Sequence, residues 1–164
     1  EYYDLDNYEA DDIIGTLDKM AENGTKYEVT IVSGDKDLIQ LADSNTTVEI
    51  SKRGVAEFES FTPDSLREKM GITADQFIDL KALMGDKSDN IPGVTKIGEK
   101  TGLKLLLEHG SLEGIYENID KLSEIPGIGK GLIQSGSQYM TKKVQTINVK
   151  LKAGYRVLLL MNQE

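Results

Sequence analysis

A strand that runs directly into an acidic turn is the feature that most limits what this chain can fold into. Residues 26–33, Lys-Tyr-Glu-Val-Thr-Ile-Val-Ser, are rich in β-branched side chains and stop at a glycine, which predicts a buried strand followed by a turn. An amphipathic helix is expected before it, over residues 8–23. A short helix at 38–41 and a second strand at 46–51 are expected after it. This alternation predicts an α/β fold with a partial parallel or mixed sheet and flanking helices.

Two further helices are expected beyond that sheet. Thr62-Pro63-Asp64 has the capping residue and the proline typical of a helix start, and Met70-Gly71 gives its end. Residues 73–84 predict the second helix, with a continuous apolar side. Asp75 and Asp79 are placed on the solvent face of that helix.

Seven carboxylates form three tight clusters at the ends of these expected elements. The carboxyl end of a strand is where open α/β sheets place ligand sites, and Mg²⁺ and Mn²⁺ take oxygen ligands. Two such ions activate a water and stabilise the leaving oxygen in phosphodiester cleavage. The alternative is that these are solvated loop acids in an acidic chain. The candidate catalytic and metal-binding residues are Glu9, Asp11, Asp12, Asp35, Asp37, Asp86 and Asp89.

Composition narrows the chemistry of such a site. Among the 164 residues there is no cysteine and one histidine, His109, so thiolate and multi-histidine sites are excluded and a metal must be bound by oxygen. His109 lies at an expected helix end and is assigned no chemistry. The net charge of -9 is uneven: residues 1–90 carry 9 basic and 21 acidic side chains, a net of -12, and residues 91–164 carry 10 and 7, a net of +3. The acidic part suits a carboxylate site, and the basic part suits phosphate contact.

A glycine-bearing segment in the basic part is a candidate for that contact. Residues 91–102 lead into a helical run at 103–107, and a short hairpin before a helix start presents free backbone N–H groups to a phosphate oxygen. Lys96 and Lys100 would add positive charge there. The alternative is a simple helix-loop-helix corner with glycine at the turn. A second candidate hairpin, residues 125–131, has a weaker helix after it.

Three motifs in order carry a family resemblance. They are residues 8–15 (Tyr-Glu-Ala-Asp-Asp-Ile-Ile-Gly), 32–38 (Val-Ser-Gly-Asp-Lys-Asp-Leu) and 83–93 (Leu-Met-Gly-Asp-Lys-Ser-Asp-Asn-Ile-Pro-Gly). Together they resemble the 5′-3′ exonuclease domain of bacterial DNA polymerase I, within the flap endonuclease family. The resemblance implies a 5′ nuclease, PIN-like core whose seven carboxylates bind two divalent metals. It also implies a helical helix-hairpin-helix region that grips duplex DNA with a K⁺ ion, through Gly93, Lys96, Gly98, Lys100 and Thr101.

The chain departs from the family pattern in three places. In the family, a strand with a metal-binding Asp, a second such Asp and a basic helical arch precede these motifs, so we expect a nuclease core truncated at its N-terminus. The family hairpin commonly reads Pro-Gly at the place of Thr95-Lys96, which predicts a hairpin of different shape. The pattern weakens after residue 122. We therefore expect a nuclease core over 1–80, a hairpin region over 81–122 and a C-terminal helical or irregular extension over 123–164.

These features predict a structure-specific 5′-3′ exonuclease or flap endonuclease that acts in DNA replication and repair. The expected partners are branched, nicked or flap duplex DNA and a DNA polymerase domain in the full-length protein. A non-catalytic DNA-binding module is the alternative, because the family's N-terminal ligands are missing. An acidic scaffold with neither activity is a third reading. No stretch approaches 18 apolar residues and no leader pattern is seen, so we expect no membrane partner and a cytoplasmic location.

Overall fold

The computed structural model describes residues 2–24, 27–52, 57–87, 90–94 and 96–124. Their contacts divide them into two compact units, residues 2–66 and residues 67–124. The helix over residues 74–84 packs on the helix over residues 99–109 and lies in the second unit. Within the described ranges, no helix is long and apolar enough to cross a membrane.

The first unit contains the expected mixed sheet. Strand β1 (Val29–Ser33) pairs in parallel with β2 (Thr46–Ser51), with Val29 opposite Thr46. The expected second strand is confirmed at both ends, and the first begins three residues later than predicted. A third strand, β3 (Phe58–Phe61), pairs antiparallel with β2 and was not predicted. Its four residues alternate so that Phe58 is exposed and Phe61 is buried, which is too short a pattern to stand out in the sequence.

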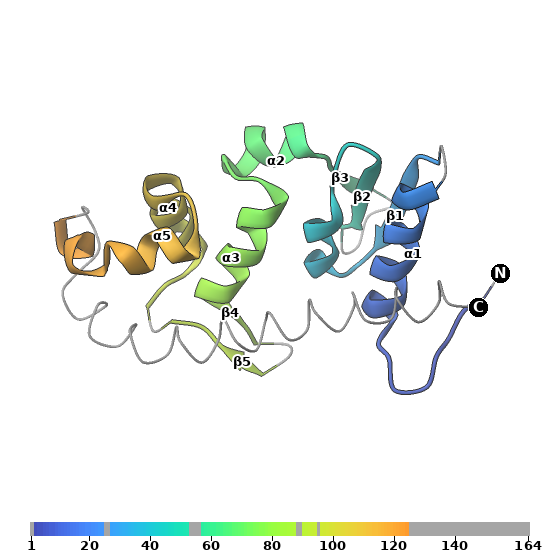
Figure 1. The fold of residues 1–164 in the computed structure, drawn as a ribbon, viewed down its shortest axis with the longest axis horizontal. Helices are drawn as coiled ribbons and strands as arrows, with labels where there is room; N and C mark the ends of the chain where they lie inside the picture. The colour runs from blue at the N-terminus through green and yellow to red at the C-terminus, as the bar shows by residue number, and fades with distance from the viewer. Residues whose placement is uncertain (1, 25–26, 53–56, 88–89, 95, 125–164) are drawn as a thin grey trace. The chain divides into compact units, whose positions relative to one another are not determined.

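Two helical elements contact this sheet (Figure 1). Helix α1 (Ala10–Gly24) confirms the predicted first helix with its start two residues later, and the 3-10 helix η1 (Lys36–Leu41) takes the place of the predicted short helix. Alternate residues of β2 are buried, so one face of the sheet forms the core. On the other face, Val32 of the edge strand β1 is 60% exposed. The buried apolar side chains of this core are Ile31, Leu38, Ile39, Val48, Ile50 and Phe61.

The C-terminal half of α1 is fixed at the start of β2. Thr46 Oγ1 donates a 2.6 Å hydrogen bond to Asp18 Oδ1, and both residues are buried. Burial raises the pKa of Asp18 above its ordinary value, although the hydrogen bond from Thr46 opposes this. One turn later, Glu22 forms an ion pair with Lys19 and a hydrogen bond with Asp43, and that hydrogen bond raises the pKa of Glu22. These contacts fix which end of α1 lies beside the beginning of the strands.

The second unit is a small helical bundle. Its Thr73–Gln76 capping box, with hydrogen bonds of 3.0 and 3.2 Å, begins the long helix at the predicted place. The side chains of Leu80, Leu83 and Leu106 are among those that form its core. Helix α2 spans the boundary between the units, and the other helical elements pack in chain order. The elements are α2 (Pro63–Met70), α3 (Ala74–Met84), α4 (Glu99–His109), α5 (Leu112–Glu117) and η2 (Ile119–Glu124).

A two-stranded hairpin joins α3 to α4 through a very close backbone approach. Strand β4 (Gly85–Asp86) pairs antiparallel with β5 (Ile91–Pro92). A Cβ atom added to Gly93 would lie 1.8 Å from the carbonyl oxygen of Met84, and one added to Gly85 would lie 2.1 Å from the Gly93 nitrogen. Only glycine fits at either position, so backbone packing alone requires both.

Asp79 corrects one expectation about α3. The sequence placed it on the solvent face with Asp75, but Asp79 is half-buried and its Oδ2 accepts a 3.0 Å hydrogen bond from the backbone N–H of Leu112. Burial raises the pKa of Asp79, against the effect of that hydrogen bond. The residue therefore joins α3 to the start of α5, which helical periodicity within α3 could not indicate.

We predict that Asp79→Ala lowers the free energy of unfolding by about 1–2 kcal/mol, because the Leu112 N–H loses its acceptor in a partly buried place. Asp79→Asn keeps an oxygen acceptor and should be much milder. Because the pKa of Asp79 is raised in the fold, its protonation favours the folded state, and this contribution is lost as pH rises through the folded pKa. The Asn variant should therefore gain stability relative to the wild type as pH rises from about 3.8. Urea unfolding across pH, with the exposed Asp75→Asn as control, measures both effects.

Two glycines of the hairpin provide a second test. Gly93→Ala should cost about 3 kcal/mol or more, since its methyl group would overlap backbone that cannot move aside. A Cβ atom on Gly98 meets nothing within 4 Å, so Gly98→Ala should cost less than about 1 kcal/mol. Melting temperatures of the two variants compare them directly. Equal destabilisation would show that the close approach at Gly93 is relieved by a shift of the hairpin.

Candidate active site and nucleic-acid interface

The first candidate cluster lies at the start of α1. Glu9 directly precedes the helix, and its backbone N–H donates a 3.1 Å hydrogen bond to Asp12 Oδ2. The N–H of Asp12 donates to Asp11 Oδ1 at 3.2 Å. Burial raises the pKa of Asp11, and repulsion from Asp12 and then from Glu9 raises it further. The helix start does not fully compensate these negative charges, and a hard cation would do so.

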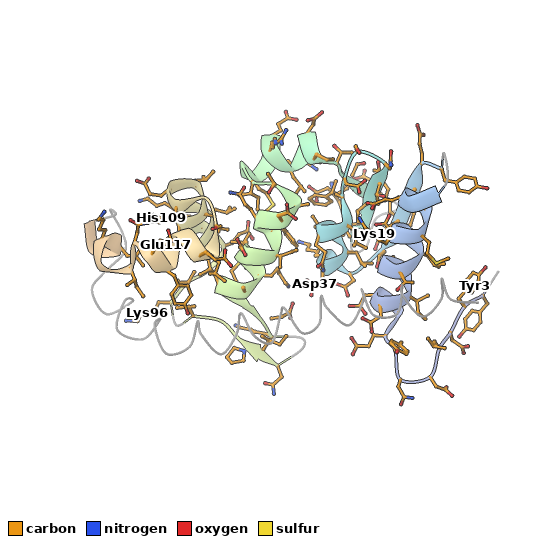
Figure 2. The ribbon with its side chains drawn as sticks, in the orientation of Figure 1. Tyr3, Lys19, Asp37, Lys96, His109 and Glu117 are labelled. Carbon is orange, nitrogen blue, oxygen red and sulfur yellow. The ribbon has the colours of Figure 1, made fainter. Side chains whose placement is uncertain are left out.

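The second cluster lies just beyond the C-terminal end of β1. Asp35 caps η1, because its Oδ1 accepts a 2.9 Å hydrogen bond from the N–H of Asp37. The N–H of Asp35 in turn donates to Ser33 Oγ at 3.0 Å. Figure 2 labels Asp37, which lies in the first turn of η1. Both carboxylates therefore lie at the end of the strand where the sequence predicted a ligand site.

The two clusters extend toward the same end of the first unit. Residues 18–22 of α1 lie at the beginning of β2, and Gly15 lies against Leu41 at the end of η1. From Asp18 back to Asp11 the helix rises about 10 Å. The five residues of β1 span about 13–16 Å. The acidic start of α1 therefore lies toward the C-terminal end of β1, which Asp35 follows in the chain.

The donor chemistry of these five carboxylates fits Mg²⁺ or Mn²⁺. Their arrangement does not form a complete metal site. In the described part of the chain, no three acidic or histidine side chains converge closely enough to hold a metal ion. Of the third cluster, Asp89 lies outside the described residues. Asp86 belongs to the second unit, where it is the last residue of β4.

Asp86 has a partner that sequence reasoning missed. Lys81, in the last turn of α3, forms an ion pair with Asp86 Oδ2, and the two side chains are 26% and 15% exposed. The sequence indicated that an acid after a helix C-terminus is costly unless it shares a cation, and Lys81 supplies one. The spacing of five residues across a helix end is not a recognised pairing pattern, so no sequence signal pointed to it.

The candidate DNA-contacting hairpin has an exposed, uncapped helix start. Gly98 is the N-cap residue of α4 and makes no side-chain capping bond, which suits a phosphate oxygen at the first N–H groups. Lys100 is exposed in the first turn, and Thr101 beside it is half-buried. Lys96, labelled in Figure 2, lies in the loop between β5 and α4 and is exposed with φ of 68°. Gly93 has the packing role described above.

The remaining sequence features are His109 and the second candidate hairpin. His109 ends α4 as expected, and its Nε2 is buried with no hydrogen-bond partner among the residues that the structure describes. The second candidate hairpin, residues 125–131, lies outside the described residues, as does the expected C-terminal extension beyond 124. Thr95, beside Lys96 in the first hairpin, is also outside them.

Curated relatives match almost the whole chain but are far longer. DNA polymerase I of Streptococcus pneumoniae serotype 4 is 67% identical over 150 residues, covering 91% of this chain and 17% of the relative. DNA polymerase I of Lactococcus lactis subsp. lactis is 63% identical with the same coverage, and that of Bacillus subtilis is 49% identical over 88% of this chain and 16% of its own length. The chain thus spans about one sixth of the length of these relatives.

Solved structures agree with that match. A complex of the bacteriophage T5 flap endonuclease with DNA and metal ions has a TM-score of 0.69 at 26% identity, covering 88% of this chain and 51% of that one. T5 5′-exonuclease with bound zinc ions gives the same score and identity, over 89% and 52%. The catalytic core of Rad2, at 18% identity and a TM-score of 0.52, shares the fold.

Family models match both parts of the chain in sequence. Residues 1–71 match the N-terminal resolvase-like domain of 5′-3′ exonucleases, and residues 72–161 match their C-terminal SAM fold. The change from one model to the other lies close to the boundary between the two compact units. The chain belongs to the 5′-3′ exonuclease family.

Proposed function

We propose that this chain is part of a structure-specific 5′-3′ exonuclease and flap endonuclease. The enzyme hydrolyses phosphodiester bonds of branched, nicked or flap duplex DNA in replication and repair. The observation that carries the proposal is the pair of family matches along the chain, which contain the acidic starts of α1 and η1. Relatives that are DNA polymerase I support a polymerase domain in the full-length protein. The T5 complex with DNA and metal ions supports both the substrate and the cofactor class.

The metal-binding role is proposed for the seven acidic residues of the three clusters. When bound, two Mg²⁺ or Mn²⁺ ions supply activation of water and stabilisation of the leaving oxygen. The raised pKa of Asp11 supports this role, because burial and then repulsion from Asp12 and Glu9 raise it, as is common for carboxylates at functional sites. The residues that would hold the ions are Glu9, Asp11, Asp12, Asp35 and Asp37 in the first unit, with Asp86 and Asp89 of the third cluster.

The hairpin is proposed to hold the duplex by its backbone phosphates. The uncapped N–H groups at the start of α4, together with Lys96 and Lys100, would bind phosphate oxygens without reading bases. Gly93 and Thr101 belong to the same proposed contact region. A K⁺ ion at this hairpin is part of the proposal.

A second function is favoured by one specific observation. Because no three acidic side chains converge within the described ranges, a DNA-binding module without catalysis remains the competing proposal. It predicts flap binding through the hairpin and no metal-dependent cleavage. Substitutions at Asp35 and Lys96 separate the alternatives.

Asp35→Asn should reduce cleavage of a 5′-flap duplex by about 100-fold or more, the upper range for loss of a residue that supports a metal. The amide oxygen still accepts the Asp37 N–H, so the cap of η1 and the fold are retained while the charge is lost. Single-turnover cleavage in Mg²⁺ or Mn²⁺ measures the effect, with the exposed Asp75→Asn as control. Flap binding by the wild type without cleavage in either metal would favour the binding module.

Lys96→Gly should separate folding from DNA binding. At φ of 68° glycine is the favoured residue, so melting temperature should stay equal or rise. Loss of one phosphate contact should weaken binding to all duplex sequences alike and reduce the slope of log affinity against log salt by about 1. Lys121→Gln, an exposed lysine of η2, removes the same charge elsewhere in the unit and should leave the slope unchanged. An unchanged slope for Lys96→Gly would remove Lys96 from the DNA contact.

A further inference from the structure

The ion pair between Lys81 and Asp86 is held in a rigid frame. Lys81 lies in the last turn of α3, whose C-cap Gly85 donates its N–H back to the Lys81 carbonyl oxygen. Asp86 pairs with Ile91 across the β4–β5 ladder, and the backbone contact of Gly85 with Gly93 leaves that ladder little freedom. The backbone is therefore held in place at both residues, and the ion pair restricts rotation of the Asp86 side chain.

The contact with Lys81 also determines the direction in which the Asp86 carboxylate points. Lys81 engages Oδ2, and a partner on one oxygen sets the plane of the group and hence the direction of the other oxygen. Both side chains are mostly buried, so the pair is shielded from solvent more than a surface ion pair. Outer partners that orient a carboxylate ligand in this way change metal affinity or activity by about 10–100-fold.

We propose that Lys81 is a positioning residue for metal binding, which orients the Asp86 carboxylate toward a divalent cation. The inference rests on the proposed function in taking Asp86 as a metal ligand. Lys81 acts through Asp86 and not on the substrate. Lys87, the exposed residue next to Asp86, carries the same charge but is not the lysine of this ion pair, so it serves as the matched control.

The experiment is a double-mutant cycle on Mn²⁺ binding, measured by electron paramagnetic resonance of the free ion. Lys81→Met should weaken Mn²⁺ binding by about 10-fold or more, and Lys81→Arg, which keeps the charge and donors, should recover most of it. Lys87→Gln should change it by less than about 2-fold, since loss of charge alone is screened at an exposed position. In an Asp86→Asn background, Lys81→Met should have no further effect. Lys81→Gln provides a second variant if the methionine variant does not fold.

Each possible result tests a different part of the proposal. If Asp86→Asn binds Mn²⁺ as the wild type does, the proposed metal role of Asp86 is wrong. If Asp86→Asn binds weakly while Lys81→Met binds normally or more tightly, the positioning role alone is overturned. An effect of Lys81→Met that persists in the Asp86→Asn background would assign Lys81 to another group, such as a DNA phosphate. A loss of flap affinity in metal-free buffer would identify that case.

Discussion

The close backbone approach between Gly93 and the carbonyl of Met84 fixes the geometry of the hairpin and of the helix before it. It sets where α3 stops, and the N–H of Val94 bonds the Leu83 carbonyl at 2.8 Å immediately afterwards. From that contact the chain runs into strand β4 with Asp86 after Met84, and into the loop before α4 after Gly93. Asp86 and the proposed phosphate-contacting loop both depend on this one backbone contact, which holds their separation within the unit.

The acidic residues of the first unit have local structural roles in addition to the proposed metal-binding role. Asp12 accepts the Glu9 N–H and Asp35 caps η1, so each has a structural reason to be acidic before any metal is considered. Such bonds orient a carboxylate but leave its charge, and the pKa of Asp11 is raised by burial and then by repulsion from Asp12 and Glu9. A cation bound to these proposed ligands would offset that repulsion.

Sequence reasoning succeeded where the signal was local. The strand over 46–51 and the helix after Thr62 were predicted because β-branched residues, a cap and a proline determine them nearly alone. The predicted difference in hairpin shape from Thr95-Lys96 stays a prediction, although Lys96 takes a left-handed conformation that glycine favours. The features that the sequence did not predict all depend on tertiary contacts. Asp79 is turned inward by Leu112 of another helix, Lys81 finds Asp86 across a helix end, and β3 exists because β2 offers it an edge.

The sheet order has a consequence for how this chain behaves among copies of itself. Strand β3 pairs along one side of β2, which leaves β1 at the edge of the described three-stranded sheet. That edge strand is Val-Thr-Ile-Val-Ser, with Val32 exposed and no charge or proline to discourage pairing. Any extended segment can add to such an edge through main-chain hydrogen bonds, regardless of its sequence. Within the described residues, β1 is therefore the strand to which an extended segment of a second copy could add and continue the sheet.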